Sequence, residues 1–355
     1  MIKEECSIRP VRSVLLAILC LGSFLVAASA LRQSLPGPSE WSVTVKLEHL
    51  AEHGGKYDTL FIGSSETFRH VIPEIIDARM AERGFPTKSF NLGGPAMTGF
   101  EADHVLREAL PLLRPNLRNV LIEPGIWRHK MQGKNRRSVR SKNWHTVRQT
   151  FGTLEMAYAL DEPLLRRIHF ALGHLQILAW RLSNYGDGER LFDGFLGTPP
   201  TQSTSAEYVA EGRGYQPLEE DSNEVVMARR RTLLEDSKQY EKAIGLLERA
   251  NRTSTPTRLI NERALADQVA LIRATGIEPV FFVPPGSFGT PYAFDLHEEG
   301  LIPHLLSFNH PDRYPELYRL DRRYDANHLN REGAEQFSRL LADRWADLIE
   351  SGALR

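Results

Sequence analysis

The sequence predicts an α/β protein of three layers, in which helices cover both faces of a mostly parallel central sheet, with a largely helical insertion. Two observations indicate this fold. Short apolar runs that end in Gly or Pro alternate with longer segments whose apolar residues recur at helical spacing. The alternation stops near residue 128 and resumes near residue 257, which indicates an insertion between two halves of one core. In such sheets ligands bind at the carboxyl ends of the strands.

The composition is that of an ordinary globular protein. The 355 residues include 44 Lys and Arg against 45 Asp and Glu, a net charge of −1. This balance argues against nucleic acid as a partner, because a phosphate-binding surface usually carries a basic excess. Both cysteines, Cys6 and Cys20, lie in the first 30 residues, and the histidines lack metal-ligand spacing. We therefore expect no metal and no cofactor.

The N-terminus has the features of an export signal. Basic residues precede an apolar run from Val14 to Ala28, and Ala28-Ser29-Ala30 offers a cleavage site between small residues. The run is close to the lower length limit of a membrane span, about 17 residues. Residues 1–30 are therefore predicted to be a signal peptide or a retained signal anchor, with membrane association through residues 14–30 if they are retained. Either predicts that the protein is exported or tethered to a membrane.

The segment that follows leads into the first half of the core. Residues 31–56 contain Pro36-Gly37-Pro38 and are predicted to be a linker that includes a short helix over 43–53. Residues 57–127 then alternate between short β-branched or aromatic runs and helical patterns. The predicted strands are 57–62, 88–92 and 119–122, and the predicted helices are 73–83 and 101–113.

The insertion and the second half of the core complete the chain. Residues 128–256 are predicted to form a helical cap, with a basic run over 130–142 that is either a solvated face or a contact for anionic lipid or acidic polysaccharide. Residues 257–355 hold a helix over 258–274, a strand over 278–283 and a helix over 331–349. The buried face of the last helix is expected to contain Ala334, Phe337, Leu341 and Leu348.

Polar residues stand where catalysis is expected in such a fold. Gly63-Ser64-Ser65 follows the first strand, and Asp325-Ala326-Asn327-His328 precedes the last helix. A serine, a histidine and an aspartate are the parts of a hydrolytic triad, in which the imidazole accepts the hydroxyl proton and the carboxylate orients the imidazole. The sequence therefore predicts a serine hydrolase with the chain order Ser, Asp, His.

Three sequence blocks carry a resemblance to a known family. FIGSS after the first strand, NLGGPAMTG after the second and DANHLNREGA before the last helix resemble the SGNH (GDSL-like) serine hydrolases in the G-S-S form found in exported bacterial envelope proteins. The resemblance covers about 57–127 and 258–349 and implies a flavodoxin-like fold. It implies Ser65 as nucleophile, His328 as general base and Asp325 as its partner, with Ser64 where the family usually has Asp.

The resemblance also implies where the oxyanion of the reaction is held. The second block, which begins at Asn91, implies a backbone donor at Ala96, with Gly93 and Gly94 close by. The third block usually supplies an Asn side chain, but here the strand runs into Glu123. Loss of one oxyanion donor costs about 2.7–4 kcal/mol in other enzymes. Trp127, which also follows the third strand, is expected at the mouth of the pocket, where it could stack on a sugar ring.

The triad and the resemblance together imply an esterase that removes acyl groups, acetyl above all, from cell-envelope carbohydrate. With the export signal, the resemblance also implies a location in the periplasm or on the extracytoplasmic face of the inner membrane. One alternative is an O-acyltransferase that uses the same triad to acylate polysaccharide. The other is a non-catalytic SGNH-like module that binds polysaccharide or docks on a membrane acyltransferase, which the missing Asn and the Ala at position 96 favour.

Overall fold

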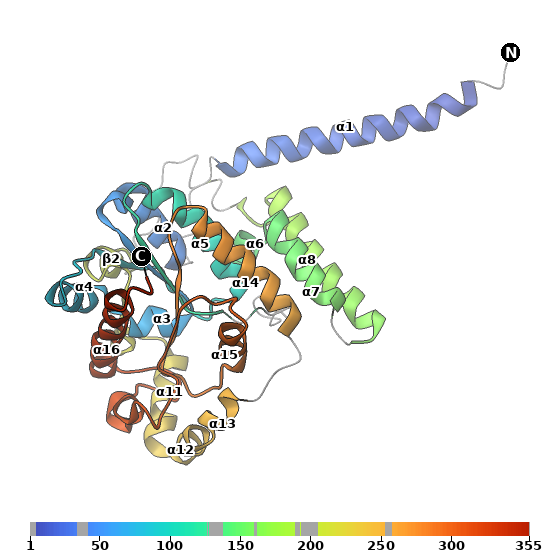
Figure 1. The fold of residues 1–355 in the computed structure, drawn as a ribbon. Helices are drawn as coiled ribbons and strands as arrows, with labels where there is room; N and C mark the ends of the chain where they lie inside the picture. Colours follow the sequence, from blue (N-terminus) through green and yellow to red (C-terminus); the bar gives the residue numbers. More distant parts are fainter. Residues whose placement is uncertain are drawn as a thin grey trace.

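A computed structural model describes residues 5–33, 42–125, 127, 138–159, 162–188, 192, 205–252 and 258–354. Its centre is a five-stranded, entirely parallel sheet in the order β2-β1-β3-β4-β5 (Figure 1). The strands are β1 Thr59–Ile62, β2 Ser89–Asn91, β3 Asn119–Ile122, β4 Val280–Val283 and β5 Leu305–Ser307. The predicted α/β class with a parallel sheet is confirmed.

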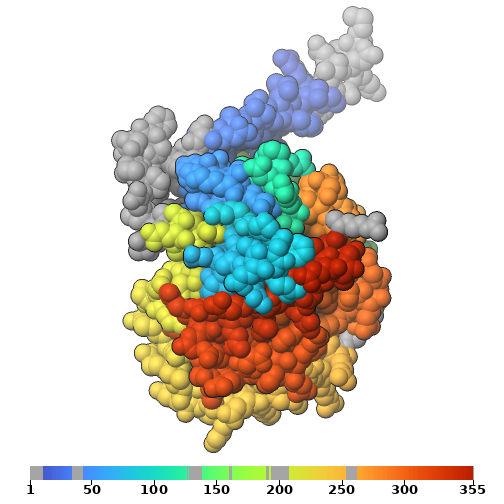
Figure 2. All heavy atoms as spheres, turned by 60° about the vertical axis from the view of Figure 1, so that its left-hand side comes forward, coloured from blue at the N-terminus to red at the C-terminus, as the bar shows by residue number. Residues whose placement is uncertain are grey.

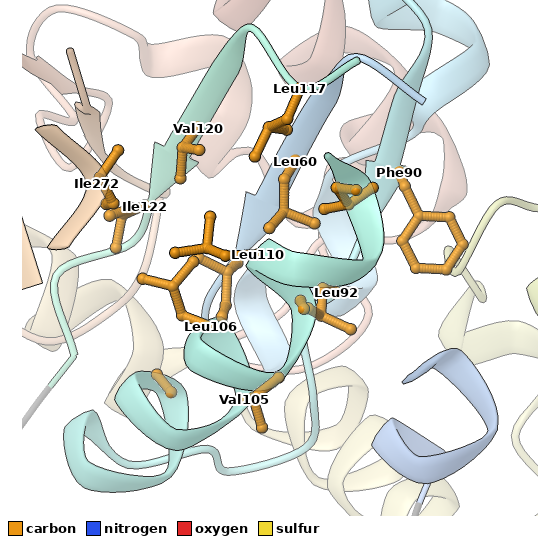
Figure 3. Packing of buried hydrophobic residues seen from close by; sticks show 14 of the residues in the cluster. Leu60, Phe90, Leu92, Val105, Leu106, Leu110, Leu117, Val120, Ile122 and Ile272 are labelled. Atoms are coloured by element: carbon orange, nitrogen blue, oxygen red, sulfur yellow. The ribbon is translucent and has the colours of Figure 1, made fainter. Parts of the chain in front are cut away.

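One face of the sheet is covered by helices α2, α5, α14 and α15. Their bounds are Ser42–His53, Gly99–Leu113, Arg258–Arg273 and Pro291–Glu298. Leu60 of β1 and Val120 and Ile122 of β3 point into this layer, where they meet Leu106 and Leu110 of α5 (Figure 3). Every second strand residue faces this layer, as the pleat of a strand requires.

The other face of the sheet is covered by α4 Pro73–Glu82 and α16 Arg331–Glu350. Phe61 and Leu121, the strand residues between those of the first layer, pack here against Phe337 and Trp345 of α16. Figure 2 shows the C-terminal residues, in red, directly beside the light-blue segment that contains α4. The sheet is therefore buried on both sides, which explains the continuous apolar runs of its strands.

Most predicted elements of the core are present within one or two residues of their predicted bounds. On the predicted face of α16, Ala334, Phe337 and Leu341 are fully buried, whereas Leu348 is half-buried. Three elements of the core were missed by the sequence analysis, one of which is α15. Strand β5 has only three residues, too few for a periodic pattern, and α3 Ser65–His70 is a helix of six residues made mostly of polar side chains.

The prediction that residues 31–56 form a linker is wrong for residues 42–56. Val43 and Leu50 of α2 have no exposed surface and belong to the same apolar layer as α5. A Cβ atom on Gly54 would lie 2.2 Å from the carbonyl oxygen of Leu112, so this segment runs against the end of α5. The polar residues of α2 concealed a buried stripe that only its packing reveals. Residues 34–41, with the Pro-Gly-Pro sequence, lie outside the described residues.

The insertion is helical, as predicted, but its described helices fall into two groups rather than one cap. The helices α6 Val139–Trp144, α7 Val147–Ala159 and α8 Leu164–Ser183 pack beside α5 and α14. The second group lies at the other end of the body (Figure 1). It comprises α11 Glu224–Glu235, α12 Lys238–Gly245 and α13 Leu247–Asn251. Helix α10 Ser205–Glu211 instead packs against α2.

The basic run is described only in part, because residues 128–137 lie outside the described residues. Of its C-terminal end, Arg140 forms two hydrogen bonds of 2.6 and 2.8 Å with the carboxylate of Glu101. Lys142 contacts buried Asp187 at 2.5 Å. These two cations serve ion pairs inside the protein, so they do not belong to a free basic surface.

The remaining elements are four short 3-10 helices and the N-terminal helix. The 3-10 helices are η1 Gly54–Lys56, η2 Leu218–Glu220, η3 Pro315–Tyr318 and η4 Leu320–Arg322. Helix α1 Glu5–Gln33 projects from the body, as Figure 1 shows, and its residues Val11–Gln33 are long and apolar enough to cross a membrane. A signal sequence would also have this length and composition.

Replacing Leu50 by Ala tests whether α2 belongs to the core. We expect the free energy of unfolding to fall by about 2–5 kcal/mol, because a fully buried leucine leaves a cavity when it is truncated. Glu52→Ala, at an exposed position of the same helix, should change it by less than about 0.5 kcal/mol. Urea unfolding followed by circular dichroism measures both. If the two substitutions lowered the free energy of unfolding equally, α2 would not belong to the core.

Candidate active site

The candidate nucleophile stands where the strand order reverses. The chain passes from β1 to β2 on one side and then to β3 on the other, so a crevice opens outside the carboxyl ends of β1 and β3. Ser65 lies there as the first residue of α3, three residues beyond the end of β1, and is partly exposed. Ser64 caps the helix, since its hydroxyl accepts a hydrogen bond of 3.1 Å from the N–H of Glu66.

The turn between β1 and α3 is clasped by Glu123, which follows β3. One carboxylate oxygen of Glu123 accepts hydrogen bonds from the N–H of Ser64 at 2.8 Å, the N–H of Thr67 at 3.2 Å and the hydroxyl of Thr67 at 2.5 Å. A Cβ atom on Gly63 would lie 2.2 Å from the Thr67 hydroxyl and 2.5 Å from that oxygen. Only glycine fits at position 63, because the side chains of Thr67 and Glu123 occupy the space that a Cβ atom would need.

The three predicted triad residues are in hydrogen-bond contact. His328 Nε2 lies 2.9 Å from the hydroxyl oxygen of Ser65, and His328 Nδ1 lies 2.9 and 3.0 Å from the two carboxylate oxygens of Asp325. Ser65 and His328 are 263 residues apart in the sequence. This is the geometry in which the imidazole can accept the serine proton while the carboxylate holds the other ring nitrogen.

The electrostatics of Asp325 suit its place beside the imidazole. Burial alone would raise the pKa of this carboxyl, but the hydrogen bond and charge of His328, with the backbone N–H groups of Asn327 and His328, lower it to about 2. Asp325 is therefore ionised throughout the range in which a serine hydrolase works. An ionised partner can stabilise the imidazolium that forms when His328 takes up a proton.

Two buried residues that the sequence analysis missed hold the loop before α16 that carries Asp325 and His328, which we call the catalytic loop after its predicted role. Arg323 has no exposed surface and donates to the carbonyl oxygens of Pro285 at 2.7 Å and Ala326 at 2.9 Å. His70, on α3, accepts a 3.0 Å hydrogen bond from the N–H of Leu329, and its ring lies edge-on to that of His328 at 5.9 Å. Burial first, and then the proximity of His328, lowers the pKa of His70 well below its usual value, so this ring is neutral. No motif links either residue to the triad; only their position after folding does.

The structure narrows the set of oxyanion donors that the sequence predicts. The N–H of Gly93 donates to the Asn91 side chain at 2.9 Å and that of Gly94 donates to the carbonyl of Gly63 at 3.1 Å, so neither is available to a ligand. The N–H groups of Ser65 and Ala96 make no hydrogen bond to the described residues. The geometry leaves these two as donors.

Ala96 has an unusual backbone. It lies in a tight turn closed by a hydrogen bond of 3.3 Å from Met97 N–H to the Gly94 carbonyl, and its φ is +48°. This left-handed conformation is disfavoured for alanine, and such strain is characteristic of functional turns. The bond from Gly94 to Gly63 places the turn beside the start of α3, where a donor to the Ser65 reaction centre is needed.

The other predicted site residues serve different purposes. Asn91 is fully buried and its amide donates to the carbonyls of Thr67 and Val71, which ties β2 to α3 rather than to a substrate. Trp127 is also buried: it packs edge-on to Phe100 and lines a separate cavity of about 520 Å³ with Asp103 and other residues. The expectation that Trp127 stands at the mouth of the triad pocket is wrong, because its ring packs against Gly99 and Phe100 at the start of α5.

A different cavity adjoins the catalytic loop. It has a volume of about 390 Å³ and lies between Asp325–Asn327 and the helices α11 and α12. Its walls include Val225, Leu233 and Tyr240, so one side of the catalytic loop is bordered by apolar side chains of the insertion. No motif in the sequence indicates that this part of the insertion reaches Asp325.

Glu66, which follows the nucleophile, is an unusual carboxyl group. Burial and then the neighbouring Glu123 raise the pKa of Glu66 to about 8. A Cβ atom on Gly286, in the loop after β4, would lie 2.6 Å from one of its oxygens, so the carboxyl group is enclosed between α3 and that loop. Glu66 therefore carries a proton at neutral pH.

Comparisons with protein-family models, with curated proteins and with solved structures give no match for this chain. Among the described residues, no group of three or more His, Cys, Asp or Glu side chains could hold a metal ion. What the site can do therefore has to be argued from its own geometry.

The raised pKa of Glu66 predicts a pH dependence of stability. The unfolded chain loses this proton near pH 4.5 and the folded protein near pH 8, so ionisation reduces the free energy of unfolding as pH rises between these values. We expect Glu66→Gln to stabilise the protein at pH 8 by about 1–3 kcal/mol, since one pKa unit is worth about 1.4 kcal/mol and water screens a half-buried group.

Thermal melting at pH 5 and pH 8 measures this effect. The difference between Glu66→Gln and the parent protein should grow with pH, whereas Glu298→Gln, at an exposed position on α15, should show no such trend. A difference for Glu66→Gln that is the same at both pH values would mean that this carboxyl group is not protonated in the folded protein.

Proposed function

We propose that the protein is a serine esterase of the SGNH type that removes acyl groups, acetyl above all, from cell-envelope carbohydrate. The observation that carries this proposal is a chain of hydrogen bonds. Ser65, beyond the carboxyl end of β1, contacts His328, and His328 contacts Asp325 in the loop before α16. The strand order and the partly exposed nucleophile agree with it. The envelope substrate rests on the resemblance of the three sequence blocks and on the apolar helix α1.

In the proposed reaction, the hydroxyl oxygen of Ser65 attacks the ester carbonyl while His328 Nε2 accepts the hydroxyl proton. The negative charge moves to the carbonyl oxygen, and the N–H groups of Ser65 and Ala96 stabilise it. The C–O bond to the sugar then breaks, and the imidazolium returns its proton to the leaving sugar oxygen. An acyl-enzyme on Ser65 remains, and Asp325 stabilises the imidazolium in both steps.

The acyl-enzyme needs an acceptor to complete the cycle. When the acceptor is water, His328 takes its proton, the hydroxide attacks the acyl carbon, and Ser65 leaves with that proton as a free hydroxyl group. The products are a carboxylic acid and the deacylated sugar. A sugar hydroxyl in the position of the water would instead give a new ester, so the alternative of an O-acyltransferase differs only in the acceptor.

The loss of the Asn donor of the third block is a specific feature of this chain. Glu123 takes that position and accepts hydrogen bonds, so it supplies none to an oxyanion. With two backbone donors rather than three donors, we expect a slower enzyme than one with a complete set. The hydrogen bonds of Glu123 to Ser64 and Thr67 offset part of this loss of rate, because they hold the turn that carries Ser65 against the end of β3.

Labelling with a fluorophosphonate tests the activated nucleophile, because only a serine whose proton is accepted by a base displaces the fluoride readily. We expect the full chain in detergent to be labelled, and Ser65→Ala and His328→Ala to reduce the labelling rate by at least about 100-fold. Ser64→Ala, which removes the neighbouring hydroxyl group, should retain most of the labelling. A folded parent that is not labelled would favour the binding module over the enzyme.

A product assay then distinguishes the acceptors. O-acetylated polysaccharide and the full chain should release free acetate at a rate that Ser65→Ala abolishes. If Ser65 is labelled but acetyl groups move to a second glycan without release of acetate, the protein is the transferase rather than the esterase.

A further inference from the structure

Helix α8 exposes a row of large apolar side chains on the face that points away from the protein body. Its inner face, which packs on α6 and α7, contains the buried residues Gly173, His174 and Ile177. The opposite face is exposed and holds six large aliphatic side chains, those of Leu164, Leu165, Ile168, Leu172, Leu175 and Leu182. Leu165 is 82% exposed and Leu172 is 60% exposed. Single exposed apolar residues are normal, but a continuous stripe marks an interaction surface.

The position of α8 next to α1 indicates what this surface meets. The side-chain amide of Asn184, at the C-terminal end of α8, donates a 2.7 Å hydrogen bond to the carbonyl of Ala28 in α1. Ala28 lies within Val11–Gln33, the segment that could cross a membrane. Figure 1 shows α8 and α7 at the edge of the body from which α1 leaves. The end of α8 is therefore held at the level where the apolar part of α1 ends.

The chemistry of α8 agrees with a lipid surface. The helix contains three Arg and two His but no Asp or Glu, which favours anionic headgroups over a basic partner. Trp180 and Tyr185 stack at 5.7 Å next to the contact with α1, and Tyr185 is exposed. Aromatic rings of this kind are enriched where a membrane meets water.

We propose that the exposed face of α8 lies in the headgroup region of the membrane that α1 enters, so that the body is attached at two places. A tether of one helix would let the body rotate and tilt, whereas a second contact along α8 fixes which side faces the lipid. The occupant of the stripe is thus the bilayer itself. This inference does not depend on the activity of Ser65.

Quenching by spin-labelled lipid tests the proposal on the full chain. Both native cysteines are replaced by serine, and a single cysteine at Ile168→Cys or Leu172→Cys carries an NBD fluorophore. The protein is reconstituted in vesicles of phosphatidylcholine and phosphatidylglycerol at 3:1, with and without a doxyl group near the headgroup. Leu234→Cys on α11 is the matched control, because Leu234 is 65% exposed and lies in the other group of insertion helices.

We expect the doxyl lipid to quench the fluorophore at positions 168 and 172 at least about threefold more than at position 234. Thermal melting of each labelled variant checks that the fold is retained. Equal quenching at all three positions would overturn the proposal. So would a blue-shifted emission at 168 and 172 that the doxyl lipid does not quench, because protein rather than lipid would then cover the stripe.

Discussion

The carboxylate of Glu123 is the contact on which the candidate site depends. It joins the end of β3 to the first turn of α3 through three hydrogen bonds to one oxygen, and it occupies the space beside Gly63. Strands β1 and β3 both lie in the interior of the sheet, so the turn that carries Ser65 is attached to strands that are paired on both sides. A serine on a free loop would have many orientations, whereas this one is held by the backbone on both sides.

The loop that carries Asp325 and His328 is also held by hydrogen bonds, with buried polar groups in place of apolar packing. Asp325 accepts two backbone N–H groups as well as the ring of His328, and Arg323 holds the loop from below through the carbonyl of Ala326. Burial of the Arg323 guanidinium has a desolvation penalty, which its hydrogen bonds to carbonyl oxygens offset. The same hydrogen bonds fix the position of the loop. The imidazole thus meets Ser65 in a fixed geometry.

The insertion connects this site to the rest of the molecule in two different ways. Its later helices border the catalytic loop: Arg230 of α11 donates to the backbone carbonyls of Arg323 and Tyr324 at 2.6 and 3.2 Å. Its earlier helices, α6 to α8, pack on the opposite part of the body, and α8 contacts α1. One inserted segment therefore supports the triad at one end and meets the apolar N-terminal helix at the other.

The sequence by itself determined four of the five strands, most of the core helices and the three side chains, Ser65, Asp325 and His328, that meet at the candidate site. Strands buried on both faces appear as apolar runs, and a nucleophile and its base follow such runs at fixed places, so these features are visible locally. Only the tertiary structure decided the roles of Glu123, His70 and Arg323, which lack a local signature because their partners are distant in the chain. It also decided that the N–H groups of Gly93 and Gly94 bond within the protein and are not free for an oxyanion, and that Trp127 lines a different cavity. The sequence does not tell whether a backbone N–H group will find an acceptor inside the folded protein, because that acceptor can come from a distant segment. The direction of a side chain is likewise set by the packing of the whole chain.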